Sequence, residues 1–426
     1  MSIPKPPSGA VTLVGRASWS LINQGAVSLG NLFVNIQLAW LLPIEEYGVF
    51  ALLLSGMLAL QVVNAALLSY PQSIRLAATR GQAHTQLLSN TLILTLGACC
   101  LLDLFLVAGL ALFGRFDLIV PASAFFLLWQ LQEAARRGLL ADLRHRVATI
   151  GDGVTYVGQP LLLGLLGAGE RVDLALALYV MAAACLAGAL VHLTRLRLTK
   201  PHLAGASSVF LDFWRIGKWQ LTINGILFMN VRLYPWALAY ADGPAAAAVF
   251  QAMLNVANLI NPLIIGLGNA IPQVAAKALA GGGIRRAWHD SRAYILTGLP
   301  LAFISAAILL LAPSLVLSVF YGKQSPYLEI SLAVQIVAIS WPARYIGDLI
   351  CCFLIGAEAG RLAVMACCAG LFASLILLPF ALPLGLAGIA GTMAAASAVL
   401  LISSYYAVTL TGATAMPPAE AALEPQ

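Results

Sequence analysis

The sequence predicts an all-α polytopic membrane protein with about twelve transmembrane helices in two lobes of six. Of its 426 residues, 61% are hydrophobic and 9% are charged, and the mean hydropathy is +0.91. Soluble proteins carry about 25% charged residues. A soluble globule of this composition could not cover its surface. Apolar stretches follow one another along the whole chain, which excludes a large water-exposed domain.

Apolar windows of roughly 20 residues, the length that crosses a bilayer, predict the individual helices. The predicted spans are 16–41, 49–70, 87–112, 118–140, 149–169, 174–196, 219–241, 244–268, 293–312, 330–354, 359–382 and 385–410.

Basic residues predict the orientation of these spans. With both termini in the cytoplasm, 18 Lys and Arg residues fall on the inner side, and only Arg115, Arg171 and Lys323 fall on the outer side. This is a strong positive-inside bias. The net charge of +6 therefore reflects cytoplasmic loops, and we expect no nucleic-acid partner. The remaining two basic residues, Arg232 and Arg344, lie in the middle of predicted spans.

An internal repeat predicts the division into lobes. Residues 43–72 and 244–273 share an opening Pro, a Val-Phe pair and a closing Pro-Gln at an offset of 200 to 201 residues. Each copy forms the second helix of a six-helix half, an arrangement typical of transporters. Chance similarity between apolar segments is the alternative. We predict an amino-terminal lobe, a cytoplasmic linker, a carboxy-terminal lobe and a cytoplasmic tail, at 1–198, 199–216, 217–412 and 413–426.

Enzyme motifs are not found in the sequence. It contains no GxxxxGK[ST], HExxH or GxSxG pattern, and we expect no catalytic residue and no cofactor. The seven cysteines lie in apolar stretches without CxxC spacing, so we predict packing residues and no metal site. Without an ATP site, transport must run downhill or on an ion gradient.

Polar residues inside the spans mark a candidate substrate pathway, because an intramembrane amide is costly unless it has a partner or faces water. Gln24, Ser28, Asn31 and Asn35 share one helix face, and Gln251, Asn255 and Asn258 repeat this spacing. The candidates in the other two helices are Gln61, Asn64, Gln220, Asn224 and Asn230. The alternative is that these amides only bond helix to helix.

Arg232 and Arg344 predict an anionic ligand, because the paired N–H donors of a guanidinium group fit two oxygens of a phosphate. Arg344 has Asp348 one turn later, so internal neutralisation is the alternative there. Arg232 has no acid at i±3 or i±4 and is the better ligand candidate. Asp103 is an isolated acid in a span and could carry a coupling proton or Na⁺; a neutral, hydrogen-bonded Asp103 is the alternative.

The charged residues at the inner end of span 118–140 predict a solvated cluster that pairs internally and meets anionic lipid headgroups. They are Glu133, Arg136, Arg137, Asp142, Arg144 and Arg146.

Several segments resemble Wzx-type polysaccharide or O-antigen flippases. AWLLPIEEYGVFALL (39–53) is similar to the opening signature of that family, and QLQEAARRGLLADLRHRVATIGDGVTYVGQ (130–159) resembles the connection between its fourth and fifth helices. FWRIGKWQLT (213–222) and the inner-loop run IPQVAAKAL (271–279) are similar to its second-half equivalents. VFYGKQSPY (319–327) resembles the Tyr-Gly turn after helix 9.

The resemblance implies membership of the multidrug/oligosaccharidyl-lipid/polysaccharide flippase superfamily, with two six-helix bundles in a V that opens alternately to either side. It implies a bacterial inner-membrane protein that moves undecaprenyl-diphosphate-linked oligosaccharide for polysaccharide biosynthesis. Arg232 and Arg344 would be cavity cations. Gln24, Asn31, Asn35, Asn224, Asn255 and Asn258 would contact substrate. Asp103 and Asp348 would couple H⁺ or Na⁺, and a polysaccharide polymerase is a candidate partner.

Two other functions stay open on the sequence. An ion-coupled multidrug or organic-cation antiporter would share the architecture but needs acidic groups in its cavity, where the second half offers only Asp348. A membrane glycosyltransferase or ligase usually needs a substantial polar outer loop, and the outer loops here are a few residues long.

Overall fold

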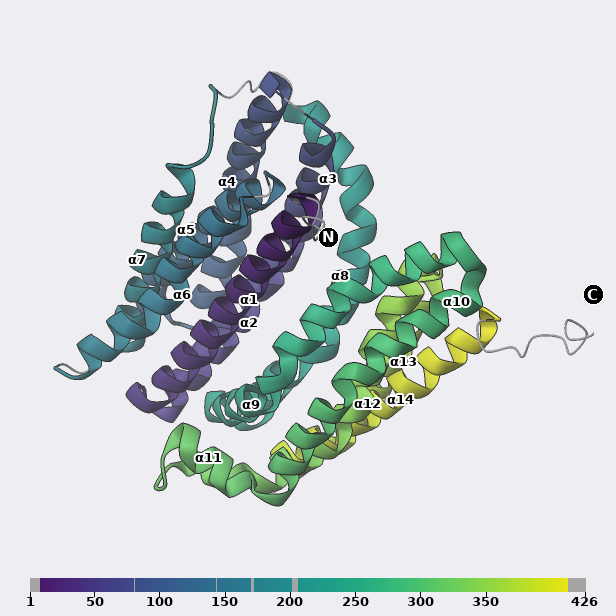
Figure 1. Cartoon of the computed structure of the whole chain (residues 1–426). Helices are drawn as coiled ribbons and strands as arrows, with labels where there is room; N and C mark the ends of the chain where they lie inside the picture. Colours follow the sequence, from purple (N-terminus) through teal and green to yellow (C-terminus); the bar gives the residue numbers. More distant parts are fainter. Residues whose placement is uncertain (1–7, 80, 143, 170–171, 201–205, 413–426) are drawn as a thin grey trace, which may run out of the picture. The chain divides into compact units, whose positions relative to one another are not determined.

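The computed structural model describes residues 8–79, 81–142, 144–169, 172–200 and 206–412, and its regular structure there is helical throughout (Figure 1). The predicted tail 413–426 and residues 201–205 of the predicted linker lie outside these ranges. The helices are α1 (Ser8–Leu41), α2 (Ile44–Asn64), α3 (Tyr70–Ala78), α4 (Gly81–Leu112), α5 (Ile119–Ala141), α6 (His145–Gly167), α7 (Leu174–Leu193), α8 (Ala206–Asp242), α9 (Pro244–Ala257), α10 (Asn261–Leu311), α11 (Pro313–Tyr321), α12 (Ser331–Gly356), α13 (Gly360–Ala381) and α14 (Gly385–Leu410).

The transmembrane prediction agrees with this architecture. Each predicted span is helical over nearly all of its length. In the described part of the chain, seven helical stretches are long and apolar enough to cross a membrane, and the last of them, Gly360–Leu410, contains both α13 and α14. The chain is therefore an all-helical, multi-pass membrane protein.

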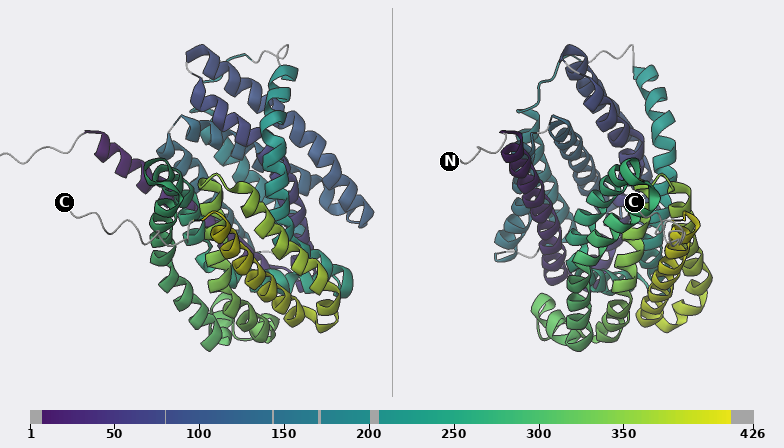
Figure 2. Two further views of the ribbon diagram at one scale, coloured as in Figure 1. Left: turned by 90° about the vertical axis from the view of Figure 1, so that its right-hand side faces the viewer. Right: turned by 45° about the vertical axis from the view of Figure 1, so that its right-hand side comes forward.

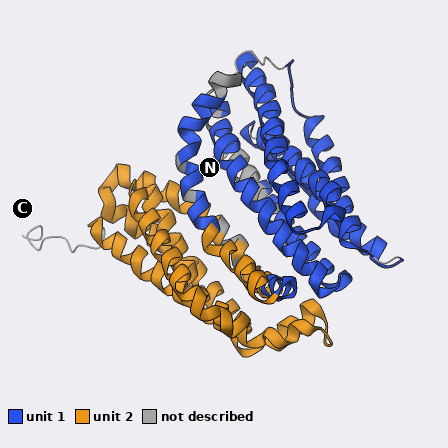
Figure 3. Cartoon of the chain, turned by 180° about the vertical axis from the view of Figure 1, so that it is seen from behind, with its two compact units in different colours: residues 1–228, 243–251 blue, residues 229–242, 252–426 orange. Residues whose placement is uncertain are grey.

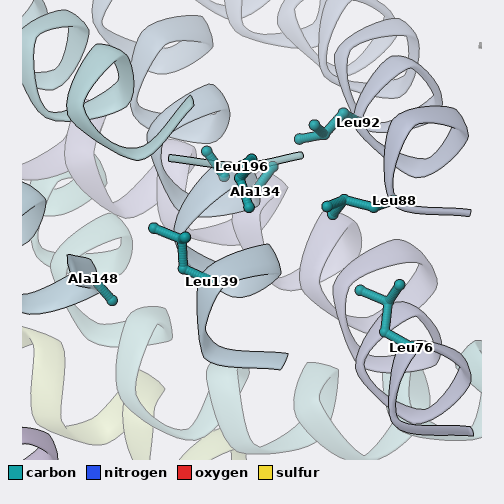
Figure 4. Packing of buried hydrophobic residues seen from close by; sticks show 8 residues of the cluster. Leu76, Leu88, Leu92, Ala134, Leu139, Ala148 and Leu196 are labelled. Carbon is teal, nitrogen blue, oxygen red and sulfur yellow. The ribbon is translucent and has the colours of Figure 1, made fainter. Parts of the chain in front are cut away.

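The first compact unit comprises Met1–Phe228 and Gly243–Gln251 (Figure 3). Within it α1 packs on α6, while α5 and α6 both pack on α7. Leucines and alanines from α3, α4, α5 and α6, with Leu196 just after α7, form one of its buried clusters (Figure 4). Leu88 and Leu139 are almost fully enclosed in it. Within a bilayer such packing stabilises through van der Waals contact, because lipid tails are as apolar as leucine.

The second unit comprises Met229–Asp242 and Ala252–Gln426. Here α12 lies between α10 and α14, and α13 runs beside α14 (Figure 2). The division between the units falls within α8, at Phe228, whereas the sequence analysis places it in the linker 199–216.

Two predicted connections are helical in the structure. Residues 206–216 of the predicted linker form the start of α8. The segment 271–279, expected in an inner loop, is also helical, because α10 continues through it and bends at Gly282 and Gly283. Gly283 has φ +73°, a conformation that residues with a Cβ seldom adopt, so glycine allows the bend.

Both helices of the proposed repeat are interrupted. A π-helical turn, η1 (Ala65–Ser69), follows α2, and a 3₁₀ turn, η4 (Asn258–Ile260), follows α9. Such turns redirect the side chains that follow them. The interruption in the second unit lies at Asn258, which lines the cavity described next.

Candidate functional site

A cavity of about 200 Å³ lies within the second unit. Its walls come from α8, the α9–α10 junction, α12 and α14. Charged and amide side chains line it together with apolar ones. Its lining residues are Asn230, Val231, Arg232, Tyr234, Leu254, Asn258, Asn261, Ile264, Val337, Ser340, Trp341, Arg344, Asp348, Met393, Ala396 and Ser397.

Arg232 reaches this cavity from α8. Its side chain is partly buried, and it forms no ion pair with any residue that the structure describes. Pro235 lies one turn further along α8 and supplies no N–H to the carbonyl of Val231. The wall beside Arg232 therefore carries both an uncompensated guanidinium and a backbone carbonyl that lacks its helical partner.

Arg344 reaches the cavity from α12 and is paired. Its Nε donates a hydrogen bond to Oδ2 of Asp348 over 2.7 Å, and both side chains are 26% exposed. The pairing that the i, i+4 spacing predicts is therefore present. Because this contact uses Nε, it leaves the two terminal nitrogens of Arg344 available to a ligand.

Trp341 contributes a further donor that the sequence analysis missed. Its indole Nε1 is buried and has no hydrogen-bond partner in the described part of the chain. An indole nitrogen can only donate, so an acceptor oxygen would satisfy it. The available signal was helical spacing, because Val337, Trp341 and Arg344 share one face of α12.

The asparagines around α9 divide between two environments. Asn258 lines the cavity together with Asn261, which the sequence analysis did not select. Asn255 lies outside the cavity, where its Nδ2 donates to the hydroxyl of Tyr321 over 3.2 Å. Residues three apart differ by about 60° around a helix, enough to send one inward and the other against α11.

The α1 candidates lie in the first unit and bond along their own helix. Nε2 of Gln24 donates to Oγ of Ser28 over 3.4 Å, and Nδ2 of Asn35 donates to the carbonyl of Asn31 over 2.8 Å. Asn31 and Asn35 also line a cavity of about 30 Å³ beside Trp129. This space is large enough for one or two waters.

Two further candidates lie apart from both cavities. Asn224 accepts a hydrogen bond from Nε2 of Gln220 over 3.2 Å, within the first part of α8. Asp103 is buried on α4, and its Oδ1 has no hydrogen-bond partner among the described residues. The structure therefore brings together five candidates in the second-unit cavity and leaves the remaining ones elsewhere; the five are Asn230, Arg232, Asn258, Arg344 and Asp348. Their substrate and coupling roles stay predictions.

The internal pairing predicted for the cluster at the inner end of α5 is confirmed, but the solvated position predicted for its central members is wrong. Glu133 is 6% exposed and pairs with Arg136 over 2.7 Å and with Arg137 over 2.8 Å. Arg136 also pairs over 2.7 Å with Asp152, a fully buried residue of α6. Asp152 lies on the next helix, outside the charged run at the end of α5. Without this partner on another helix, a solvated position was the expectation.

The formal charge of the second-unit cavity follows from its lining. Two arginines and one aspartate give a net charge of +1, and the aspartate is already bonded to one arginine. Uncompensated positive charge at this depth is costly unless it serves a ligand or a watery path. The cavity is thus suited to an anion with several acceptor oxygens.

Comparison with known proteins gives no match to any protein family model and none to a curated protein. Solved structures do match. A multidrug resistance MATE family transporter of the MOP superfamily, in an inward-facing conformation, superposes with a TM-score of 0.71 at 16% identity, over 93% of this chain and 100% of that one. The lipid II flippase MurJ, in an inward closed conformation, has a TM-score of 0.72 at 11% identity, over 92% and 87% of the two chains.

This chain has the fold of those transporters. A third structure, a MOP superfamily transporter from Pyrococcus furiosus, matches with a TM-score of 0.68 at 14% identity, over 94% of each chain. That protein is described as having a binding pocket of reverse polarity that suggests a different function. Pocket charge therefore differs among proteins of this fold, so the ligand class has to be argued from the cavity itself.

Proposed function

We propose that the protein is a flippase that translocates an undecaprenyl-diphosphate-linked oligosaccharide across the bacterial inner membrane, by alternating access and without chemistry. The observation that carries this proposal is the net positive cavity of the second unit, in which Arg232 forms no ion pair with a described residue. A diphosphate would be the group held there, and the polyprenyl tail would stay in lipid. The Wzx-type resemblance and the MurJ match support the same substrate class.

Cavity size supports a head-group site. A volume of about 200 Å³ is smaller than the roughly 300–1,000 Å³ of pockets that enclose drug-sized ligands. A diphosphate is small enough for such a space, whereas a whole glycolipid is not. Asn258 and Asn261 would donate to phosphate or to the first sugar hydroxyls.

The test is transport by reconstituted protein carrying Arg232→Gln. In proteoliposomes with a fluorescent polyprenyl-diphosphate oligosaccharide, we expect flipping to fall at least about 30-fold, because truncating one partner of a desolvated charge pair costs 2–5 kcal/mol. Arg285→Gln removes the same charge from an exposed position of α10 and should leave flipping unchanged. Equal flipping by both variants would contradict the proposed site.

An ion-coupled multidrug or organic-cation antiporter is the second candidate. Two observations favour it, namely the carboxylate of Asp348 on the cavity wall and the match to a multidrug resistance MATE family transporter. Against it, that carboxylate is bonded to Arg344. Efflux of a cationic dye by the same proteoliposomes, with no movement of glycolipid, would favour this candidate.

A further inference from the structure

We propose that Asp348 is an internal counter-anion that competes with the ligand's phosphate for Arg344 and thereby allows release. The inference rests on the proposed function, because it concerns the same anionic ligand. In this role Asp348 acts on the ligand through Arg344, because it occupies the guanidinium until phosphate displaces it. This role differs from the ion-coupling role that the sequence analysis assigned to Asp348.

The geometry of the pair allows exchange. Asp348 and Arg344 lie one turn apart on α12 and are joined by a single contact of 2.7 Å. Because both residues belong to one helix, side-chain rotation alone can break and re-form the contact. Both side chains are 26% exposed, so a phosphate oxygen can reach the guanidinium.

The charges of the cavity make such a competitor useful. Among the described residues of the lining, Asp348 is the one acid beside two arginines. Without it, a diphosphate would face two uncompensated guanidinium groups and bind tightly, whereas transport requires binding that is weak enough to allow departure. Arg232 can engage the ligand first, because it has no ion-pair partner among the described residues, and Arg344 joins when phosphate displaces Asp348.

Competition and a purely structural role predict opposite changes in anion affinity when Asp348 is neutralised. If Asp348 only holds Arg344 in place, its neutralisation should weaken anion binding. If it competes for Arg344, neutralisation should strengthen binding, since one competing carboxylate and its repulsion of the phosphate are both removed. Release should then slow, so tighter binding and slower turnover should appear together.

The experiment measures binding of inorganic pyrophosphate to the purified full-length protein by titration calorimetry, and flipping by the same samples in proteoliposomes. Asp348→Asn should bind pyrophosphate about tenfold more tightly than the wild type and should flip glycolipid more slowly. Asp242→Asn is the matched control, because it neutralises an exposed carboxylate at the end of α8 in the same unit, outside this cavity. It should leave the affinity for pyrophosphate unchanged.

A double variant separates competition from general repulsion. In an Arg344→Gln background, Asp348→Asn should no longer improve binding, because the residue for which the carboxylate competes has been removed. A gain of the same size in that background would overturn the inference. So would equal or weaker binding by Asp348→Asn when the wild type binds.

Two further outcomes are distinguishable. If the wild type does not bind pyrophosphate, the proposed function fails and the inference fails with it. If Asp348→Asn does not yield monodisperse protein, Asp348→Ser provides a second neutral side chain, for which the same gain is expected. Failure of both variants to fold would show that Asp348 is a structural partner of Arg344 and would overturn the inference.

Discussion

At a single residue, the indole N–H of Trp341, which has no hydrogen-bond partner among the described residues, can be tested by substitution. Trp341→Phe keeps an aromatic ring on the cavity wall and removes the donor. We expect the affinity for pyrophosphate to fall about tenfold, because a hydrogen bond to a charged acceptor contributes roughly 1.5–3 kcal/mol. Isothermal titration measures the change.

A matched variant tests whether the donor or the ring matters. Trp288→Phe alters a second-unit tryptophan that contacts Phe353 at a centroid distance of 5.0 Å and lies outside the cavity. Its affinity for pyrophosphate should equal that of the wild type. Equal losses in both variants would mean that Trp341 only supports packing.

Single residues also mark the limit of what the sequence could predict about the site. Arg232 and Arg344 stand out because guanidinium groups are rare in apolar stretches. Trp341 and Asn261 do not stand out, because tryptophan and asparagine are compatible with many helix faces. Asn255 and Asn258 occur in one polar stripe, yet only Asn258 lines the cavity. Helix rotation, which neighbouring helices determine, separates them.

The first turns of α8 are tied to α3 within the first unit. Nε and Nη2 of Arg75 donate to the two carboxylate oxygens of Asp212 over 2.7 and 2.5 Å, a bidentate contact. This contact lowers the pKa of Asp212 below its ordinary value of 3.8, mainly through the hydrogen bond from Arg75. The contact is therefore complete at neutral pH and is lost as the pH falls through the lowered pKa.

Removal of that contact should loosen the start of α8 at neutral pH. In Asp212→Asn, we expect faster amide hydrogen exchange over residues 210–217, because the neutral amide no longer forms the bidentate ion pair. Asp290→Asn is the control, since it alters a weaker pair with Arg286 on α10, at 3.9 Å. Unchanged exchange in Asp212→Asn would show that packing alone holds this segment.

At the scale of elements, apolar length predicted the spans well because each must match the bilayer. Apolar length alone predicts a loop at 271–279, since Lys277 and the following glycines interrupt the apolar pattern. In the structure α10 continues through these residues. Helix that extends beyond the apolar core needs no apolar residues, so hydropathy alone cannot detect it.

Over the whole molecule, the two units differ in how they treat buried charge. In the first unit, Glu133 and Asp152 neutralise Arg136 and Arg137 through short contacts. In the second, the cavity lining keeps a net positive charge. The repeat in the sequence predicts two related halves, but it could not predict this asymmetry, because Asp152 and Arg232 occupy no matching positions. The asymmetry is the basis for assigning the anionic head group to the second unit.

The most direct test of this account is the charge preference of the purified protein, measured as a competition between inorganic pyrophosphate and the organic cation tetraphenylphosphonium. We predict saturable binding of pyrophosphate that is lost in Arg232→Gln, and no displacement of pyrophosphate by the cation. Binding of tetraphenylphosphonium that depends on Asp348, with none of pyrophosphate, would contradict the account and favour a cation antiporter.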